Sequence, residues 1–238
     1  MAHLIQSANC LTAWRDVCRH ILQHGDGFNM LVQIDNPLTY TQEQLNEITN
    51  SGVISAVEIS DIVNTIFPTK LHRRNVTLGN SQFYDKHEQI YLRGKKMHRK
   101  NRSRWGNYFL RFTKFGGNRK NQLQPIIDGI NNRANHQKAC YIMHVSSVDL
   151  DNNTRVIGNP CLQYVQFGVY NNALHLSAVY RNHDFLTKAL GNYIGLSKLL
   201  EFVCNKTGST IGSVTCQSLH YELKKRPSVE TCLNNLTW

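Results

Sequence analysis

The chain has 238 residues and carries 27 Lys and Arg against 16 Asp and Glu, which gives a formal net charge of +11. This length can bury a sizeable core, and it suits one large domain at least as well as two small ones. No apolar run approaches the ~20 residues of a membrane span, and no leader pattern opens the sequence. We therefore expect a single domain over residues 1–238 in a cytoplasmic protein.

Periodic apolar residues predict three helices and a strand in the first third of the chain. Residues 13–24 have apolar side chains at helical spacing between a Thr cap and a Gly stop, so we expect a helix there. Residues 29–34 have the composition of a strand, and Thr41 begins a short helix with a capping box. Residues 59–67 are predicted as a further helix that Pro68 stops.

The middle of the chain carries the excess positive charge. Residues 69–82 are weakly patterned, and 83–91 have the apolar spacing of a helix that leads into a basic segment, residues 93–120. This basic segment contains eleven Lys or Arg and no Asp or Glu, and its densest part, from Arg93 to Arg104, is predicted to be a loop. Such density indicates an anionic partner such as nucleic acid. Charge alone identifies no ligand, and a solvated loop is the alternative.

A long hairpin is the clearest feature of the second half. Residues 162–170 and 174–181 have the composition of strands, and they flank Asn171-Asn172, a pair that tolerates the positive φ angles of a tight turn. The other predicted elements here are helices over 126–130 and 193–203 and strands over 139–145 and 210–223. The whole order predicts an α/β (α+β) fold with a mixed, largely antiparallel sheet flanked by helices.

The cysteines and histidines give no support to a metal site or to disulfides. An odd, scattered set of cysteines in a chain of this length is typical of reduced thiols. The seven are Cys10, Cys18, Cys140, Cys161, Cys204, Cys216 and Cys232. No C-x-x-C pair occurs, and the eleven histidines form no H-E-x-x-H spacing, so we expect no metal.

Three short motifs in the second half carry a family resemblance. They are NPCLQYVQF (Asn159 to Phe167), YRNHD (Tyr180 to Asp184) and GNYIGLS (Gly191 to Ser197). In order and spacing they resemble the catalytic half of thymidylate synthase: its proline-cysteine strand, its arginine-containing phosphate turn and its asparagine-led helix.

Weaker similarity extends towards the amino terminus. TAWRDVCRHIL with NMLVQIDNP resembles the family's first helix and strand, ISDIVNTIF its helix with a catalytic glutamate, and RWGNYFLRF its glycine-tyrosine loop. The resemblance therefore covers most of the chain and implies the thymidylate synthase-like fold.

The chemistry of this family explains which residue types it needs. Carbon 5 of uracil is a poor nucleophile, but addition of a thiolate at carbon 6 turns the ring into an enolate. The resemblance implies that Cys161 is this thiolate. It also implies that Arg181 binds the nucleotide phosphate, where a guanidinium would lower the thiol pKa as well. Asn192 would recognise N3 and O4 of the pyrimidine, because an amide offers one donor and one acceptor.

The resemblance assigns further roles. Asp61 falls where the family has glutamate for proton transfer, and Tyr108 where a tyrosine assists removal of the carbon 5 proton. Asp184 matches the aspartate that binds the pterin of methylenetetrahydrofolate, which implies this cofactor. Tyr221 and Lys138 match substrate-binding positions, and Lys138 lies in the segment that a partner subunit lends. We therefore expect a homodimer.

Each of these residues has a structural alternative. A cysteine in an apolar strand is commonly a small buried hydrophobe. Arg181 could serve in a surface ion pair, and Asn192 and Asp184 could serve as helix caps.

The sequence also departs from the family pattern. Leu162 and Leu219 replace two histidines, and Asn182 replaces the serine after the phosphate-binding arginine. The partner's paired arginines appear here as Lys138 and Ala139, and no segment up to Trp238 matches the family's closing tail. A weaker phosphate site that stays open to water favours hydroxymethylation, another substrate or loss of catalysis.

Two classes of function follow. In the first, the protein is a transferase that adds a methyl or hydroxymethyl group at carbon 5 of a pyrimidine nucleotide. In the second, the fold is an inactive module that binds nucleic acid or a protein through the basic segment. Asn192 favours uracil over cytosine, while the sugar and the choice between nucleotide and polynucleotide stay open.

Overall fold

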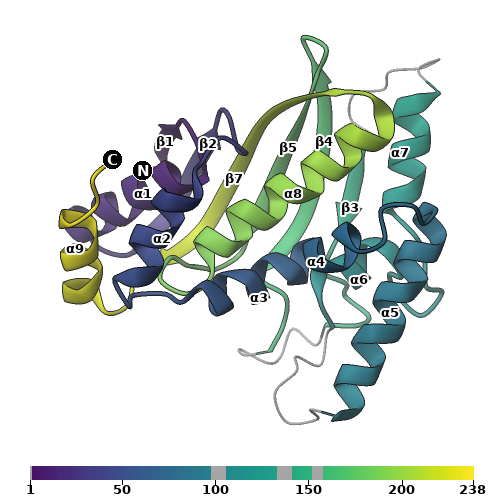
Figure 1. The fold of residues 1–238 in the computed structure, drawn as a ribbon, viewed down its shortest axis with the longest axis horizontal. Coiled ribbons are helices and arrows are strands. Elements are labelled where there is room, and N and C mark those ends of the chain that lie inside the picture. The colour runs from purple at the N-terminus through teal and green to yellow at the C-terminus, as the bar shows by residue number, and fades with distance from the viewer. Residues whose placement is uncertain (1, 98–105, 133–140, 152–157) are drawn as a thin grey trace.

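A seven-stranded mixed sheet is the centre of the fold, as the computed structural model shows (Figure 1). The structure describes residues 2–97, 106–132, 141–151 and 158–238. The strands are β1 (His3–Ser7), β2 (Gly27–Ile34), β3 (Ile142–His144), β4 (Leu162–Tyr170), β5 (Ala173–Tyr180), β6 (His183–Asp184) and β7 (Thr210–Glu222).

The strand order is β1-β2-β7-β5-β4-β3, and β6 pairs with the end of β7. The pairs β2·β7, β3·β4 and β4·β5 are antiparallel, while β1·β2, β5·β7 and β6·β7 are parallel. The predicted hairpin is confirmed, and both Asn171 (φ 49°) and Asn172 (φ 59°) adopt the positive φ of its turn. The predicted α/β (α+β) class is therefore confirmed.

Helices pack against this sheet. They are α1 (Cys10–His24), α2 (Gln42–Asn50), α3 (Ala56–Ile66), α4 (Thr69–Arg73), α5 (Asn80–Met97), α6 (Tyr108–Thr113), α7 (Leu123–Asn131), α8 (Ala189–Thr207) and α9 (Arg226–Asn234). Thr41 and Ser55 cap α2 and α3 with capping boxes, and Gly208 ends α8 in the left-handed conformation (φ 64°). Among the described residues, no helix is both long and apolar enough to cross a membrane.

Some expected boundaries are wrong. Helix α5 continues to Met97, so the first part of the predicted basic loop is helical, and 98–105 lie outside the described residues. The glycine-tyrosine loop contains the helix α6, whose N-cap Asn107 accepts a hydrogen bond from the backbone of Leu110 (2.8 Å). The elements β1, β6, α4 and α9 were not predicted from the sequence, because each is short and lacks a full hydrophobic period.

Two glycines bring α3 against α8. A Cβ atom at Gly191 would lie 2.6 Å from Cβ of Ile62 and 3.1 Å from the backbone oxygen of Ile59. One turn later, a Cβ atom at Gly195 would lie 3.0 Å from Cβ of Ile66. The absence of side chains at these two positions therefore allows the two helices to approach closely, which places α3 beside the first turn of α8 (Figure 1).

A buried ion pair fixes the short helix α6. The guanidinium of Arg111 donates two hydrogen bonds to the carboxylate of Asp151 (2.8 and 3.0 Å) and a third to the backbone oxygen of Val145 (2.9 Å). Both charged side chains are almost fully buried. A paired, hydrogen-bonded charge tolerates such burial, so this pair holds α6 against the chain that follows β3.

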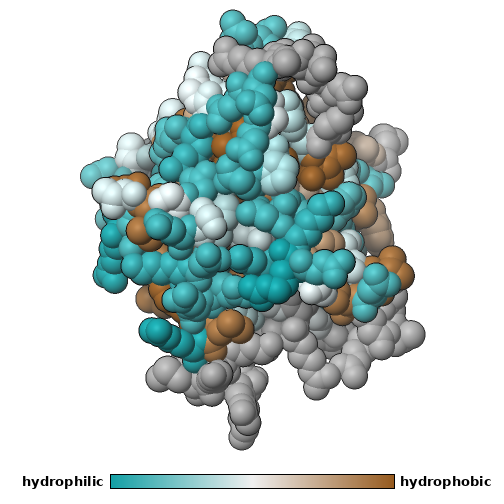
Figure 2. Space-filling view, turned by 90° about the vertical axis from the view of Figure 1, so that its right-hand side faces the viewer, coloured by the Kyte–Doolittle hydropathy of each residue, from teal (hydrophilic) through white to brown (hydrophobic). Residues whose placement is uncertain are grey.

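The surface around α5 and α7 is mostly hydrophilic, with separate apolar spots (Figure 2). Three bases of the basic segment form ion pairs: Arg111 with Asp151, Lys114 with Asp85 (2.7 Å) and Arg119 with Glu88 (2.6 Å). Their charges are therefore partly neutralised within the fold. The nucleic-acid prediction rests chiefly on the run up to Arg104, most of which lies outside the described residues.

The contact between α3 and α8 predicts the effect of a single methyl group. Gly191→Ala should lower the free energy of unfolding by about 1–2 kcal/mol, because overpacking outweighs the better helix propensity of alanine. Urea denaturation followed by circular dichroism measures this change. Gly168→Ala on β4 is the control, since no atom lies within 4 Å of its added Cβ. Equal denaturation midpoints for the two variants would contradict this account of the helix contact.

Candidate active site

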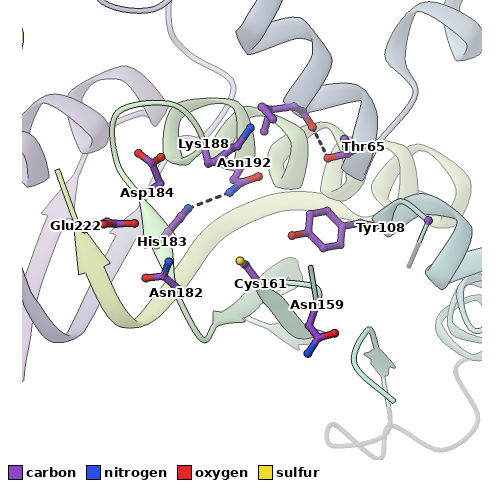
Figure 3. A pocket seen from close by; sticks show the side chains of 12 residues that line it. Thr65, Tyr108, Asn159, Cys161, Asn182, His183, Asp184, Lys188, Asn192 and Glu222 are labelled. Carbon is purple, nitrogen blue, oxygen red and sulfur yellow. Dashed lines mark hydrogen bonds between the residues drawn. The ribbon is translucent and has the colours of Figure 1, made fainter. Parts of the chain in front are cut away.

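A cavity of about 430 Å³ lies where β6 and β7 meet the start of α8. This volume is in the range of small-molecule sites and suits a mononucleotide. Its lining comes from segments far apart in the chain (Figure 3). The lining residues are Ile62, Thr65, Gly106, Tyr108, Asn159, Cys161, Asn182, His183, Asp184, Lys188, Asn192 and Glu222.

Cys161 precedes β4, and its thiol points into the cavity (Figure 3). Its backbone oxygen accepts a hydrogen bond from the backbone N–H of Arg181 (2.8 Å), which ties the cysteine to the end of β5. Of the six cysteines that the structure describes, Cys161 is half-buried and the other five are buried. Cys161 is therefore the described thiol that a ligand in the cavity can reach.

Burial and charge act on the Cys161 thiol in opposite directions. Burial raises its pKa above the ordinary value of 9.0, and this is the largest effect. The positive charges of Arg181 and Lys188 lower the pKa, while the negative charges of Asp184 and Glu222 raise it. The expected lowering by Arg181 is present, but burial outweighs it, so the resting group is a thiol.

Asn192 lies in the first turn of α8 and ends a chain of buried polar groups (Figure 3). Its amide nitrogen is 3.0 Å from Nε2 of His183, whose Nδ1 is 2.8 Å from the hydroxyl of Ser218. Burial lowers the pKa of His183 to about 3, so this imidazole is neutral. Asn192 therefore presents a fixed amide to the cavity rather than a helix cap.

Tyr108 is the first residue of α6, and its ring faces Cys161 across the cavity (Figure 3). The backbone N–H of Leu162 donates to its hydroxyl (3.4 Å). Burial and the neighbouring Cys161 raise the pKa of this phenol, so it stays protonated. Cys161, Asn192 and Tyr108, predicted from separate motifs, thus line one cavity.

Comparison with known proteins finds curated relatives over part of the chain. The chain is 32% identical over 98 residues to a protein of Methanococcoides burtonii named "Putative thymidylate synthase", which is 41% of this chain and 43% of that protein. Proteins of the same name match from Methanosarcina barkeri (31% over 98 residues, 41% of this chain) and Methanocaldococcus jannaschii (33% over 96 residues, 40% of this chain), again with 43% of the relative covered.

Over these residues the chain is similar to the thymidylate synthase family. Its alignment spans less than half the length of the curated relatives that it matches. No family model matches the chain.

Arg181 is not among the residues that line the cavity, and it contacts the segment that carries Cys161. Its Nε donates to the backbone oxygen of Pro160 (3.1 Å), and one terminal nitrogen donates to that of Asn159 (3.4 Å). These bonds hold the segment that carries Cys161, and the guanidinium charge reaches the thiol.

Asp184 lines the cavity and also shapes the turn before α8. One carboxylate oxygen accepts from the backbone N–H groups of Leu186 (2.9 Å) and Thr187 (3.1 Å), and the other accepts from the Thr187 hydroxyl (2.9 Å). It therefore caps the preceding turn. Helix α8 itself begins after Lys188 without a side-chain cap.

Two other predicted site residues, Asp61 and Tyr221, do not line the cavity, and a third lies outside the described residues. Asp61 is exposed on α3, where Ile62 and Thr65 face the cavity instead. Tyr221 packs its ring over Gly27, where its hydroxyl lies 2.5 Å from the position of an added Cβ. Lys138 lies outside the described residues. Asp61 and Tyr221 are therefore not lining residues of this cavity, and their roles stay predictions.

Sequence reasoning assigned no role to several lining residues. His183 lies within the motif YRNHD, so its neighbours Arg181 and Asp184 could have drawn attention to it. Lys188 and Glu222 have no motif of their own, and only the folded chain brings their charges near Cys161. Within the described ranges, no group of three or more His, Cys, Asp or Glu is arranged to hold a metal ion.

The charges around Cys161 predict the pH dependence of its reactivity. Because the thiolate is the nucleophile, alkylation of Cys161 by iodoacetamide should accelerate as pH rises, with a midpoint above 9.0. Lys188→Ala should move the midpoint to higher pH, because it removes a positive charge, and Glu222→Gln should move it to lower pH. Peptide mass spectrometry across a pH series measures both shifts.

Lys86→Ala on α5 is the matched control, because this exposed lysine bonds Asn75 and does not line the cavity. Shifts of the same sign in the Lys188 and Glu222 variants would contradict the arrangement of charges described above.

Proposed function

We propose that this protein is a transferase that adds a one-carbon unit, as methyl or hydroxymethyl, at carbon 5 of a uracil nucleotide. The observation that carries the proposal is the convergence of Cys161, Asn192 and Tyr108 on one nucleotide-sized cavity. Their residue types suit a nucleophile, a group that recognises the pyrimidine edge and a group that assists proton transfer.

The proposed reaction begins at the thiol. Cys161 loses its proton to water in the open cavity, and the thiolate Sγ forms a bond to carbon 6 of the ring. The electron pair of the 5,6 double bond moves towards O4, which makes carbon 5 nucleophilic. Arg181 and Lys188 stabilise the thiolate, because both positive charges lower the Cys161 pKa.

The later steps need a recognised ring and a route for a proton. Asn192 meets the N3 and O4 edge, where its amide pairs with a donor and an acceptor. Tyr108 stays protonated, so we assign it to hold a water molecule that removes the carbon 5 proton. Once carbon 5 has formed a bond to the one-carbon unit, loss of that proton and release of Sγ from carbon 6 restore the 5,6 double bond.

The donor set fits the folate that the resemblance implies. A carboxylate can accept about four hydrogen bonds, and Asp184 uses three inside its own turn. One acceptor position therefore stays available for a pterin N–H at the cavity wall. When bound, methylenetetrahydrofolate would supply the one-carbon unit at the oxidation level of formaldehyde, and Asp184 would hold its pterin. A methyl product would also need a hydride, which the reduced pterin would supply, whereas a hydroxymethyl product would take its oxygen from water.

The transfer can be tested directly on the product. Incubation of the protein with deoxyuridylate and methylenetetrahydrofolate should add a methyl or hydroxymethyl mass to the nucleotide, as mass spectrometry detects. Cys161→Ser should reduce the yield to background, because an unactivated hydroxyl cannot replace the thiolate. Cys232→Ser in α9 is the control and should keep full yield, since Cys232 is not a lining residue. Product formation by Cys161→Ser would remove this cysteine from the mechanism.

We further propose that the protein is a homodimer that pairs through the outer face of the sheet. Leu4 pairs in register with Leu31, and Leu219 lies near them on β7; all three are exposed (67%, 37% and 38%) on the face opposite to the buried Val32. Apolar side chains exposed side by side on a sheet are typical of an interface.

Light scattering at micromolar concentration should give twice the chain mass, and Leu31→Glu should give a monomer. Leu92→Glu on α5 is the control, because Leu92 is exposed (47%) on a different part of the surface. A monomeric wild-type protein would contradict the homodimer proposal but would leave the proposed reaction at Cys161 unaffected.

A further inference from the structure

A buried pair of side chains controls which atom of Asn192 faces the cavity. The amide nitrogen of Asn192 lies 3.0 Å from Nε2 of His183, and an amide NH₂ group can only donate. Nε2 must then accept, so the single proton of the neutral imidazole sits on Nδ1. Nδ1 in turn donates to the hydroxyl of Ser218 (2.8 Å).

The surroundings of His183 leave this arrangement little freedom. The ring is 1% exposed and stacks on Tyr180, with 4.3 Å between centroids and 4° between planes. Tyr193 meets it edge-on (5.8 Å, 89°), and Phe185 packs at 4.9 Å. Asn192 and Ser218 are buried as well (4% and 0% exposed). A rotation of the imidazole would therefore break aromatic packing and two hydrogen bonds together.

The orientation of this amide distinguishes two pyrimidines. With its nitrogen held by His183, Asn192 turns its oxygen towards the cavity as an acceptor. Uracil offers a hydrogen on N3 to such an acceptor, whereas cytosine has a bare acceptor at N3. With the amide reversed, the opposite preference would hold, because an NH₂ donor would then meet cytosine N3.

We propose that His183 and Ser218 are positioning residues that lock the Asn192 amide with its oxygen towards the cavity, so that the site selects uracil over cytosine nucleotides. This inference rests on the proposed function, since it names how that same site chooses its substrate. It gives a role to two side chains that touch no substrate in the reaction described above.

The inference predicts a change of specificity in a conservative variant. In Ser218→Ala the proton on Nδ1 of His183 has no hydroxyl acceptor, so the tautomer with its proton on Nε2 becomes the more stable one. Nε2–H then donates to the amide oxygen, and Asn192 reverses. The ratio of deoxycytidylate to deoxyuridylate dissociation constants should fall about tenfold, the size expected for one buried hydrogen bond. Isothermal titration calorimetry measures this ratio.

The fold contains a matched control on the same strand. Ser213 of β7 bonds Nδ1 of His175 (2.9 Å), a second serine–histidine pair that does not line the cavity. Ser213→Ala should leave the ratio of the two dissociation constants unchanged. If Ser218 has only a structural role, Ser218→Ala should weaken the binding of both nucleotides equally and leave the ratio of their dissociation constants unchanged. That result would overturn the inference.

A measurement on the unliganded wild-type protein separates this inference from the proposed function. Nitrogen-15 NMR of the histidines should show the His183 proton on Nδ1, and a proton on Nε2 would overturn the proposed amide orientation. If the wild-type protein binds neither nucleotide, the proposed function fails and uracil selection fails with it. A proton on Nδ1 would still uphold the orientation of Asn192 in that case.

Discussion

Helix α8 is buried on two sides, against β5 and β7 on one and against α3 on the other. Its contact with α3 requires Gly191 and Gly195, where any side chain would meet isoleucine side chains of α3. Asn192 follows the first of these glycines, so the same turn that receives α3 presents the amide to the cavity. Much of the candidate site thus depends on the close approach of two helices rather than on any single hydrogen bond.

The surroundings of Cys161 keep its side chain protonated in the absence of a ligand. Burial raises the pKa of Cys161, and two negative charges at the cavity wall act in the same direction. Arg181 and Lys188 oppose them, but Arg181 is held by the backbone of residues 159 and 160 and cannot move closer without breaking those bonds. In this account only the small fraction of Cys161 that is thiolate reacts, by adding to carbon 6 of the bound ring.

Local patterns predicted the fold better than they predicted the site. The hairpin at Asn171-Asn172 and the capped helices follow from turn chemistry and apolar spacing, which act between near neighbours. Cys161 and Asn192 were predicted from motifs whose spacing reflects the fold. Asp61 does not line the cavity, because a helix turns about 100° per residue and its neighbour Ile62 faces inward instead.

Other features of the site depend on contacts between distant segments, and no sequence period encodes them. His183 and Ser218 are 35 residues apart in the sequence, and the pairing of β6 with β7 brings them into hydrogen-bond contact. Glu222 reaches the cavity only because β7 runs beside β6, and α6 is held in place by an ion pair with Asp151. Such partners become visible only once the sheet order is known.

The central claim is that Cys161 adds to carbon 6 of a uracil nucleotide, and hydrogen exchange at carbon 5 tests it without any folate. Reversible addition makes carbon 5 basic, so deoxyuridylate incubated with the protein in D₂O should gain deuterium at that carbon. Proton NMR should show the carbon 5 signal disappear with wild-type protein and persist with Cys161→Ser. Persistence of the signal with wild-type protein that binds deoxyuridylate would contradict the account.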